Sequence, residues 1–144
     1  MDTFQAEVDR IPVDDNWKKR LDATWAKYYD DPDFVDIKDC LAAMCPGRMR
    51  CCYCEDSAAE GIDHIAPKAL FPQSTFAWSN YIYACAVCNK KKSDTWALFV
   101  PNGVNRTFTR IPRHRKGHPR KFPTGTDHVF INPEWMTQAV FLNL

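Results

Sequence analysis

Apolar residues recur at helical spacing in the first third of the chain and predict two helices. The first is expected over 14–28, with Asp14 or Asp15 as its N-cap, and the second over 32–44, where a Pro-Gly pair ends it. Their apolar positions are Trp17, Leu21, Trp25 and Tyr28 in the first helix and Phe34, Ile37, Leu41 and Met44 in the second. Each helix therefore has one apolar face, with which we expect it to pack on the residues that follow.

Short apolar runs separated by turn residues fill the middle of the chain. Strands are expected in 48–56, which enters a cysteine-rich turn, in 61–65 and in 81–84. A helix is expected over 90–100, where a Pro-Asn-Gly sequence ends it. Short strands beside several helices indicate the α+β class.

After residue 100 the sequence is rich in basic residues, proline and glycine. A long loop or irregular hairpin is expected up to residue 127, followed by strands over 128–132 and 140–144. Because the last strand runs to Leu144, we expect the native chain to continue beyond it. The predicted segments are an N-terminal helical segment that packs on the core (1–47), the core itself (48–100), and a basic loop with a C-terminal strand extension (101–144).

The composition fits one globular domain with an additional helical segment. An apolar fraction of 45% over 144 residues is enough to bury a core. The longest apolar runs are far shorter than a membrane span, and the first residues lack the pattern of a signal peptide. A cytoplasmic protein without a membrane partner is therefore expected.

Seven cysteines need an explanation in a chain that is expected in a reducing compartment. Two CxxC pairs stand out, namely Cys51 with Cys54 and Cys85 with Cys88. Four such thiolates can close a tetrahedron around a structural zinc ion, and Cys52 could replace Cys51 as a ligand. Buried free cysteines are the alternative, and this is our interpretation of Cys40 and Cys45.

The net charge of +1 hides an uneven distribution along the chain. Acidic side chains dominate residues 1–40, whereas residues 95–126 contain none and include many arginines and lysines. A basic segment in a nearly neutral chain predicts one face for a polyanion. The candidate nucleic-acid contacts are Lys68, Lys90, Lys91, Lys92, Arg113, Arg115 and Lys116. A solvated helix face is the alternative for the three consecutive lysines.

Polar residues with catalytic potential lie between the two cysteine pairs and just after the second pair. They are Asp63, His64, Asn80 and Asn89. Phosphodiester hydrolysis needs a base that takes a proton from water, which suits a histidine, and a cation on the phosphate. A carboxylate and an amide oxygen suit a magnesium or manganese ion. Taken singly, these residues have simpler explanations, such as a structural Asp-His hydrogen bond or an asparagine in a turn.

The segments CCYCE, IDHIAPK, WSNYIYAC and CNKKKSD, in this order, resemble the HNH endonuclease family. The resemblance covers about residues 48–95 and implies a ββα-metal fold, in which two strands and a helix surround one catalytic divalent ion. It implies that His64 is the general base and that Asn80 orients the loop and the histidine. It also implies that Asp63 and Asn89 hold the ion. Asparagine at the last position suits Mg²⁺ or Mn²⁺ better than Zn²⁺.

A phenylalanine-proline loop and a late INPE sequence extend the resemblance beyond this core. They are similar to HNH effectors of Septu-type and retron-associated anti-phage systems, which implies a bacterial defence nuclease that works beside an ATPase. DNA is the expected substrate, and RNA, including transfer RNA, is the alternative. A catalytically silent zinc-dependent module that binds nucleic acid or protein is the other interpretation.

Overall fold

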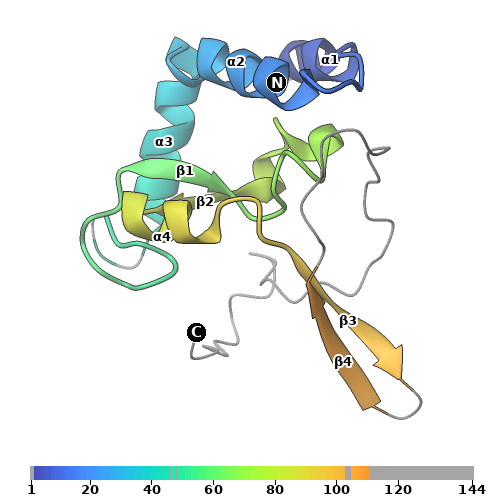
Figure 1. Ribbon diagram of the computed structural model, residues 1–144. Coiled ribbons are helices and arrows are strands. Elements are labelled where there is room, and N and C mark those ends of the chain that lie inside the picture. The colour runs from blue at the N-terminus through green and yellow to red at the C-terminus, as the bar shows by residue number, and fades with distance from the viewer. Residues whose placement is uncertain (1, 46, 48, 103–104, 111–144) are drawn as a thin grey trace.

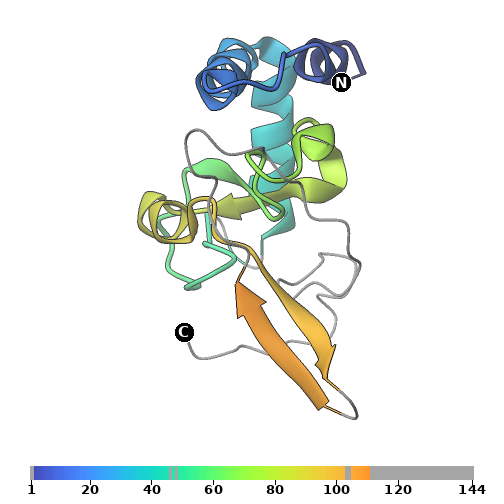
Figure 2. The ribbon, with the colours of Figure 1, turned by 45° about the vertical axis from the view of Figure 1, so that its right-hand side comes forward.

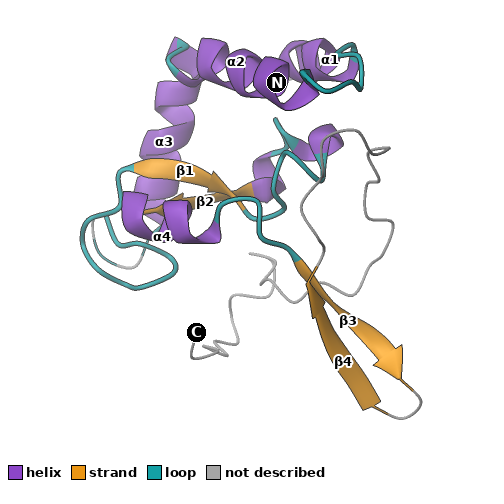
Figure 3. Ribbon diagram, in the orientation of Figure 1, coloured by secondary structure: helices purple, strands orange, loops and turns teal. Residues whose placement is uncertain are grey.

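The computed structural model describes residues 2–45, 47, 49–102 and 105–110 (Figure 1). Three helices come first, and two small two-stranded sheets with a short helix between them follow (Figure 3). The helices are α1 (Asp2–Asp9), α2 (Trp17–Tyr29), α3 (Pro32–Met44) and α4 (Ala86–Lys92), with 3-10 turns η1 (Pro72–Ser74) and η2 (Trp78–Asn80). The strands are β1 (Gly61–His64), β2 (Tyr81–Ala84), β3 (Ala97–Asn102) and β4 (Asn105–Arg110). No helix in these described residues is long and apolar enough to cross a membrane.

The N-terminal region contains three helices, so the prediction of two helices missed α1. This helix has only eight residues, and its apolar positions Phe4 and Val8 lie one turn apart. Val8 is nevertheless buried in the core, because tertiary packing stabilises a helix that is too short to form alone. Residues 111–144, which include the predicted strands at 128–132 and 140–144, lie outside the described part of the chain.

Helix α2 begins later than predicted. Its N-cap is Asn16, without a side-chain cap, whereas the Asp14 carboxylate accepts a hydrogen bond from the Asn16 backbone N–H at 2.8 Å. The prediction of Asp14 or Asp15 as N-cap is therefore wrong. In α3 the Asp31 side chain caps the first turn, and the predicted face is buried at Phe34 but not at Met44, which is exposed.

Strands β1 and β2 form an antiparallel pair in which Ile62 lies opposite Tyr83 and His64 opposite Tyr81. In place of the strand predicted over 48–56, the described residues 49–56 form turns, and the Cys52 N–H connects this segment to β2 by donating to the Tyr83 carbonyl at 3.0 Å.

The predicted helix over 90–100 is wrong, because α4 ends at Lys92 and β3 follows. Cys85, whose Sγ accepts from the Cys88 N–H, starts α4 earlier than expected. An Asn-Gly pair after an apolar run is a strong hairpin signal, and β3 indeed pairs with β4. This hairpin extends away from the helices and the first sheet (Figure 2).

Two groups of buried side chains lie on the two faces of the β1–β2 sheet. The larger group joins the sheet to the N-terminal helices and includes Trp17, Leu21, Phe34, Leu41, Ile62, Phe76, Tyr81 and Tyr83. The smaller group consists of Ile65, Leu70, Phe71, Ile82 and Trp96. Because side chains alternate along a strand, Ile62 and His64 face the larger group, while Asp63 shares its face with Ile82.

Candidate metal and catalytic sites

Four cysteines from the two CxxC pairs meet between the 51–54 turn and the start of α4. The Sγ atoms of Cys51, Cys54, Cys85 and Cys88 all lie within 4.8 Å of one another. Four thiolates about 2.3 Å from a tetrahedral zinc ion would be roughly 3.8 Å apart, and the Cys54 and Cys85 Sγ atoms are 3.9 Å apart. The donor set therefore fits a structural zinc ion with four sulfur ligands.

Backbone N–H groups support this thiolate cluster. The Tyr53 N–H donates to Cys51 Sγ and the Cys88 N–H donates to Cys85 Sγ, both at 3.4 Å. Burial alone would raise the pKa of Cys51, but hydrogen bonds from the backbone of Cys85, Cys54 and Tyr53 lower it to about 7. The backbone thus favours the thiolate at Cys51, whereas burial and the neighbouring thiols raise the pKa of Cys88.

The remaining cysteines lie outside the cluster. Cys52 Sγ is 3.9 Å from Cys45 Sγ and not part of the group of four, so the structure does not support Cys52 as a substitute for Cys51. Cys45 is partly buried against the core, as predicted, whereas Cys40 is exposed on α3. The prediction that Cys40 is a core residue is wrong.

Asp63 lies at the end of β1 in a buried, charged environment. Its Oδ2 accepts a hydrogen bond from the Tyr53 hydroxyl at 2.7 Å and lies 3.2 Å from the Lys92 Nζ. The two charged side chains are only 7% and 6% exposed. Burial raises the pKa of Asp63 and lowers the pKa of Lys92, and their ion pair offsets part of both shifts.

His64, the next residue, lies in an aromatic environment. Its Nε2 is 2.9 Å from the Thr75 carbonyl oxygen, and its ring contacts the rings of Trp25 and Tyr81 at centroid distances of 4.4 and 5.5 Å. A carbonyl only accepts, so Nε2 carries the proton and Nδ1 is left as the proton acceptor. Burial, with the nearby Lys68 ammonium second, lowers the His64 pKa to about 3, so the imidazole is neutral at pH 7.

Asn80 holds the loop between β1 and β2. Its Oδ1 accepts from the Ala66 N–H at 2.7 Å, and its Nδ2 donates to the carbonyls of Ala66 and Ser74 at 3.0 and 2.9 Å. The Asn80 carbonyl in turn accepts from the Ile65 N–H at 2.9 Å. The side chain is therefore bonded to the beginning of the loop that follows His64, at Ala66, and to its middle, at Ser74.

Asp63, His64 and Asn89 line one cleft of about 570 Å³. A carboxylate and an amide that border the same open space offer the oxygen donors that magnesium and manganese prefer, so the donor chemistry fits such an ion. The Asp63 carboxylate is already paired with the Lys92 ammonium, so a metal ion bound here has to share the carboxylate with Lys92 or displace it.

The predicted phosphate-binding lysines have different surroundings. Lys90 lines the cleft and Lys91 is exposed, whereas Lys68 lines the cleft and is paired with Asp22. Lys92 is buried, paired with Asp63 and hydrogen-bonded to the His64 carbonyl, so it is not a freely exposed lysine of a phosphate-binding surface. The predicted contacts Arg113, Arg115 and Lys116 lie outside the described residues.

Sequence reasoning missed the contribution of α2 to the cleft, where Lys18, Asp22 and Trp25 form part of the lining. Trp25 belonged to a helical apolar pattern that indicated only packing, and it does pack, but on His64. No sequence signal places Lys18 or Asp22 there, because their partners are distant along the chain.

The fold and the two sites define a small α+β protein that has a cluster of four cysteines able to hold a metal ion and a polar cleft lined by Asp63, His64 and Asn89. Residues 51–95 match the family model of the HNH endonucleases. The matched segment contains all four clustered cysteines, Asp63, His64, Asn80 and Asn89, and it supports a nuclease of the HNH family. No curated protein and no solved structure matches the chain.

Proposed function

We propose that this protein is a metal-dependent HNH endonuclease that hydrolyses phosphodiester bonds of nucleic acid, with DNA as the expected substrate. One observation carries the proposal: a neutral histidine with its Nε2–H on the Thr75 carbonyl borders a cleft with Asp63 and Asn89, inside the segment that matches the HNH model.

In this proposal His64 is the general base. The Thr75 carbonyl holds the Nε2 proton, so Nδ1 takes the proton from the attacking water. The low pKa of His64 keeps this nitrogen free at neutral pH. Asn80 acts indirectly, because its three hydrogen bonds hold the loop that carries Ala66 next to the histidine.

Asp63 and Asn89 would hold the magnesium or manganese ion. When bound, such an ion neutralises charge on the scissile phosphate and stabilises the leaving oxygen. Tyr53 fixes the orientation of the Asp63 carboxylate by donating a hydrogen bond to Oδ2. The cysteine cluster would hold zinc and so position α4, which carries Asn89 and Lys92.

The narrower assignment to an anti-phage effector that works with an ATPase is part of this proposal and rests on the sequence resemblance. A purified chain that needs such a partner would cleave only in its presence. RNA cleavage and a silent zinc-dependent binding module are the competing functions.

The test is cleavage of supercoiled plasmid with magnesium or manganese by wild type, His64→Ala and the control His128→Ala, which lies outside residues 51–95. We expect nicked or linear DNA from wild type and control, and a rate about 10²- to 10⁴-fold lower from His64→Ala. Zinc content and circular dichroism should be the same in all three proteins. Equal cleavage by His64→Ala would refute the role of the histidine. Absence of cleavage on both DNA and RNA, with binding retained, would favour the silent module.

A further inference from the structure

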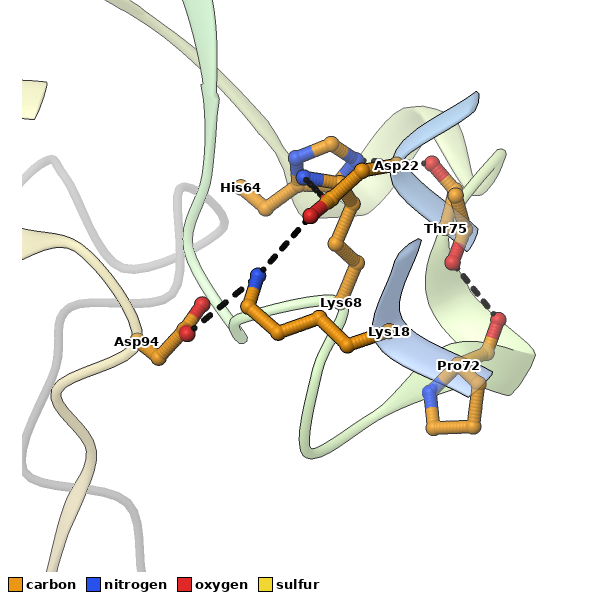
Figure 4. A network of polar contacts seen from close by, with 7 residues as sticks. All are labelled: Lys18, Asp22, His64, Lys68, Pro72, Thr75 and Asp94. Carbon is orange, nitrogen blue, oxygen red and sulfur yellow. Dashed lines mark hydrogen bonds and ion pairs between the residues drawn. The ribbon is translucent and has the colours of Figure 1, made fainter. Parts of the chain in front are cut away.

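Helix α2 contributes charged residues to the cleft from outside the segment that matches the HNH model. Lys18 and Asp22 line the cleft together with Lys68 and Asp94 (Figure 4). These four side chains form a chain of ion pairs that runs from the edge of the cleft to the side of His64. The family resemblance accounts for neither Lys18 nor Asp22.

Asp22 is the centre of this network, because each of its carboxylate oxygens pairs with a different ammonium group. Oδ1 lies 2.9 Å from the Lys68 Nζ, and Oδ2 lies 3.2 Å from the Lys18 Nζ. Lys18 also lies 3.4 Å from the Asp94 carboxylate. One anion that bridges two lysines with two oxygens has the arrangement that the two non-bridging oxygens of a phosphodiester can adopt.

The bridge lies next to the proposed general base. In Figure 4 the Lys68 ammonium and the Asp22 carboxylate lie beside the His64 ring. Their charges act on the pKa of His64 in opposite directions, since Lys68 lowers it and Asp22 raises it. An anion held at this point would therefore be close to the bond that His64 helps to cleave.

The ion pairs of Asp22 are also of the kind that a substrate can replace. Lys18 and Asp22 have side chains that are 44% and 45% exposed and Lys68 is 19% exposed, and solvent-exposed ion pairs contribute little to stability. The Lys92–Asp63 pair, in contrast, is only 6–7% exposed, and separating such a pair is costly. An incoming phosphate is thus expected to exchange with Asp22 rather than with Asp63.

We propose that Lys18 and Lys68 form a binding subsite for one backbone phosphate adjacent to the scissile bond, and that the Asp22 carboxylate occupies this subsite until nucleic acid replaces it. The inference rests on the proposed nuclease function and adds α2 to the substrate site. Lys18 and Asp22 then tune substrate binding, while the chemistry stays with residues of the matched segment.

The test measures binding of a fluorescein-labelled 20-base-pair DNA duplex and of an RNA hairpin to the zinc-loaded full chain at several salt concentrations. Magnesium and manganese are omitted, and gels check that the probes stay intact. Lys18→Gln and Lys68→Gln should each make the slope of log K against log salt for the duplex shallower by about 0.9, because each lysine neutralises one phosphate. Lys19→Gln, on an exposed neighbour of Lys18, is the matched control and should change the slope much less.

The variant Asp22→Asn tests whether Asp22 competes with a phosphate for the two lysines or only holds them in position. If Asp22 competes with phosphate, removing its charge should tighten binding about two- to five-fold, as expected for weak exposed pairs. Weaker nucleic-acid binding by Asp22→Asn would mean that Asp22 only holds the lysines in position. An equal gain in binding by the exposed control Asp15→Asn would mean that the gain comes from the change in net charge and not from a subsite. Either result overturns the subsite, as do unchanged slopes for the lysine variants or no binding of both probes.

Cleavage assays on the same proteins separate this inference from the nuclease proposal. Cleavage by wild type together with an unchanged salt slope for Lys18→Gln would overturn the subsite and keep the nuclease. A slope that depends on Lys18 without cleavage of DNA or RNA by wild type would keep the phosphate site and favour the silent binding module over the nuclease.

Discussion

The two faces of the β1–β2 sheet give the neighbouring residues Asp63 and His64 different environments. On one face Asp63 stays next to a buried cation, Lys92, and a hydroxyl donor, Tyr53. On the other face His64 is packed against Trp25 and Tyr81, and its Nε2 is hydrogen-bonded to the Thr75 carbonyl. Two residues adjacent in sequence therefore meet a charged environment and an aromatic one, because a strand turns consecutive side chains to opposite faces.

The environments of Asp63 and His64 also differ in whether their partners lie inside the segment that matches the family model. Lys92 and Tyr53, the partners of Asp63, lie within residues 51–95, whereas Trp25 comes from α2. The matched segment supplies the charged side of the site, and the N-terminal helices complete the aromatic side. The low pKa of His64, which is due mainly to burial, is thus a property of the whole chain and not of the HNH segment alone.

The largest effect on the charged face is expected from removing a candidate zinc ligand on α4, the helix that also carries Lys92. Cys88→Ser removes one of the four clustered thiols at the start of α4, and metal binding to such sites contributes about 10–16 kcal/mol to folding in small zinc modules. We expect loss of zinc, measured by elemental analysis, and loss of the cooperative unfolding transition. Cys40→Ser, at an exposed cysteine outside the cluster, is the control and should behave like wild type. A Cys88→Ser protein with full zinc content would show that the cluster is not the zinc site.

A smaller effect is expected when the aromatic face is weakened. Phe34 is fully buried, and its ring contacts Trp25 and Tyr81, the two residues that flank His64. Phe34→Ala should lower the free energy of unfolding by about 3–5 kcal/mol, measured by urea denaturation. Val35→Ala, at the exposed neighbour, should change it by less than about 0.5 kcal/mol. Similar values for the two variants would mean that the N-terminal helices do not stabilise the core.

The cysteine cluster and the strands β1 and β2 were easier to predict from the sequence than the surroundings of Asp63 and His64. The CxxC spacing predicted the cysteine cluster, and the short apolar runs predicted β1 and β2, since both signals are local. The pairing of Lys92 with Asp63 was not predicted, because a run of three lysines usually marks a solvated surface. Trp25 fitted a packing pattern, and no local signal shows which residue such a side chain contacts.

The predicted limits of the helices were wrong where tertiary contacts or side-chain chemistry outweigh the hydrophobic periodicity. Helix α1 is too short for a clear pattern, and it is held in place by packing between Phe4, Tyr28 and Phe76. Helix α4 ends at Lys92, and the apolar residues beyond it belong to a hairpin whose partner strand is supplied by 105–110. Periodicity alone does not separate a short buried strand from a helix.

A still smaller change in the free energy of unfolding is expected when the pH is lowered, because His64 on the aromatic face is buried. The folded-state pKa of His64 is about 3, against 6.5 for a free histidine, so below pH 6.5 the unfolded chain binds a proton that the folded chain excludes. The stabilising contribution is therefore complete above pH 6.5 and is lost as the pH falls towards 3. Between pH 6.5 and 5.5 the loss should be about 1 kcal/mol in the free energy of unfolding.

His64→Phe, which keeps an aromatic ring but does not titrate, should lack this part of the loss. Asp63 and the cysteines are present in both proteins, so their titration cancels in the comparison of urea unfolding at the two pH values. A loss of the same size in wild type and variant would show that the folded protein does not lower the pKa of His64. The aromatic face would then have no effect on the histidine, and the contrast between the two faces would disappear.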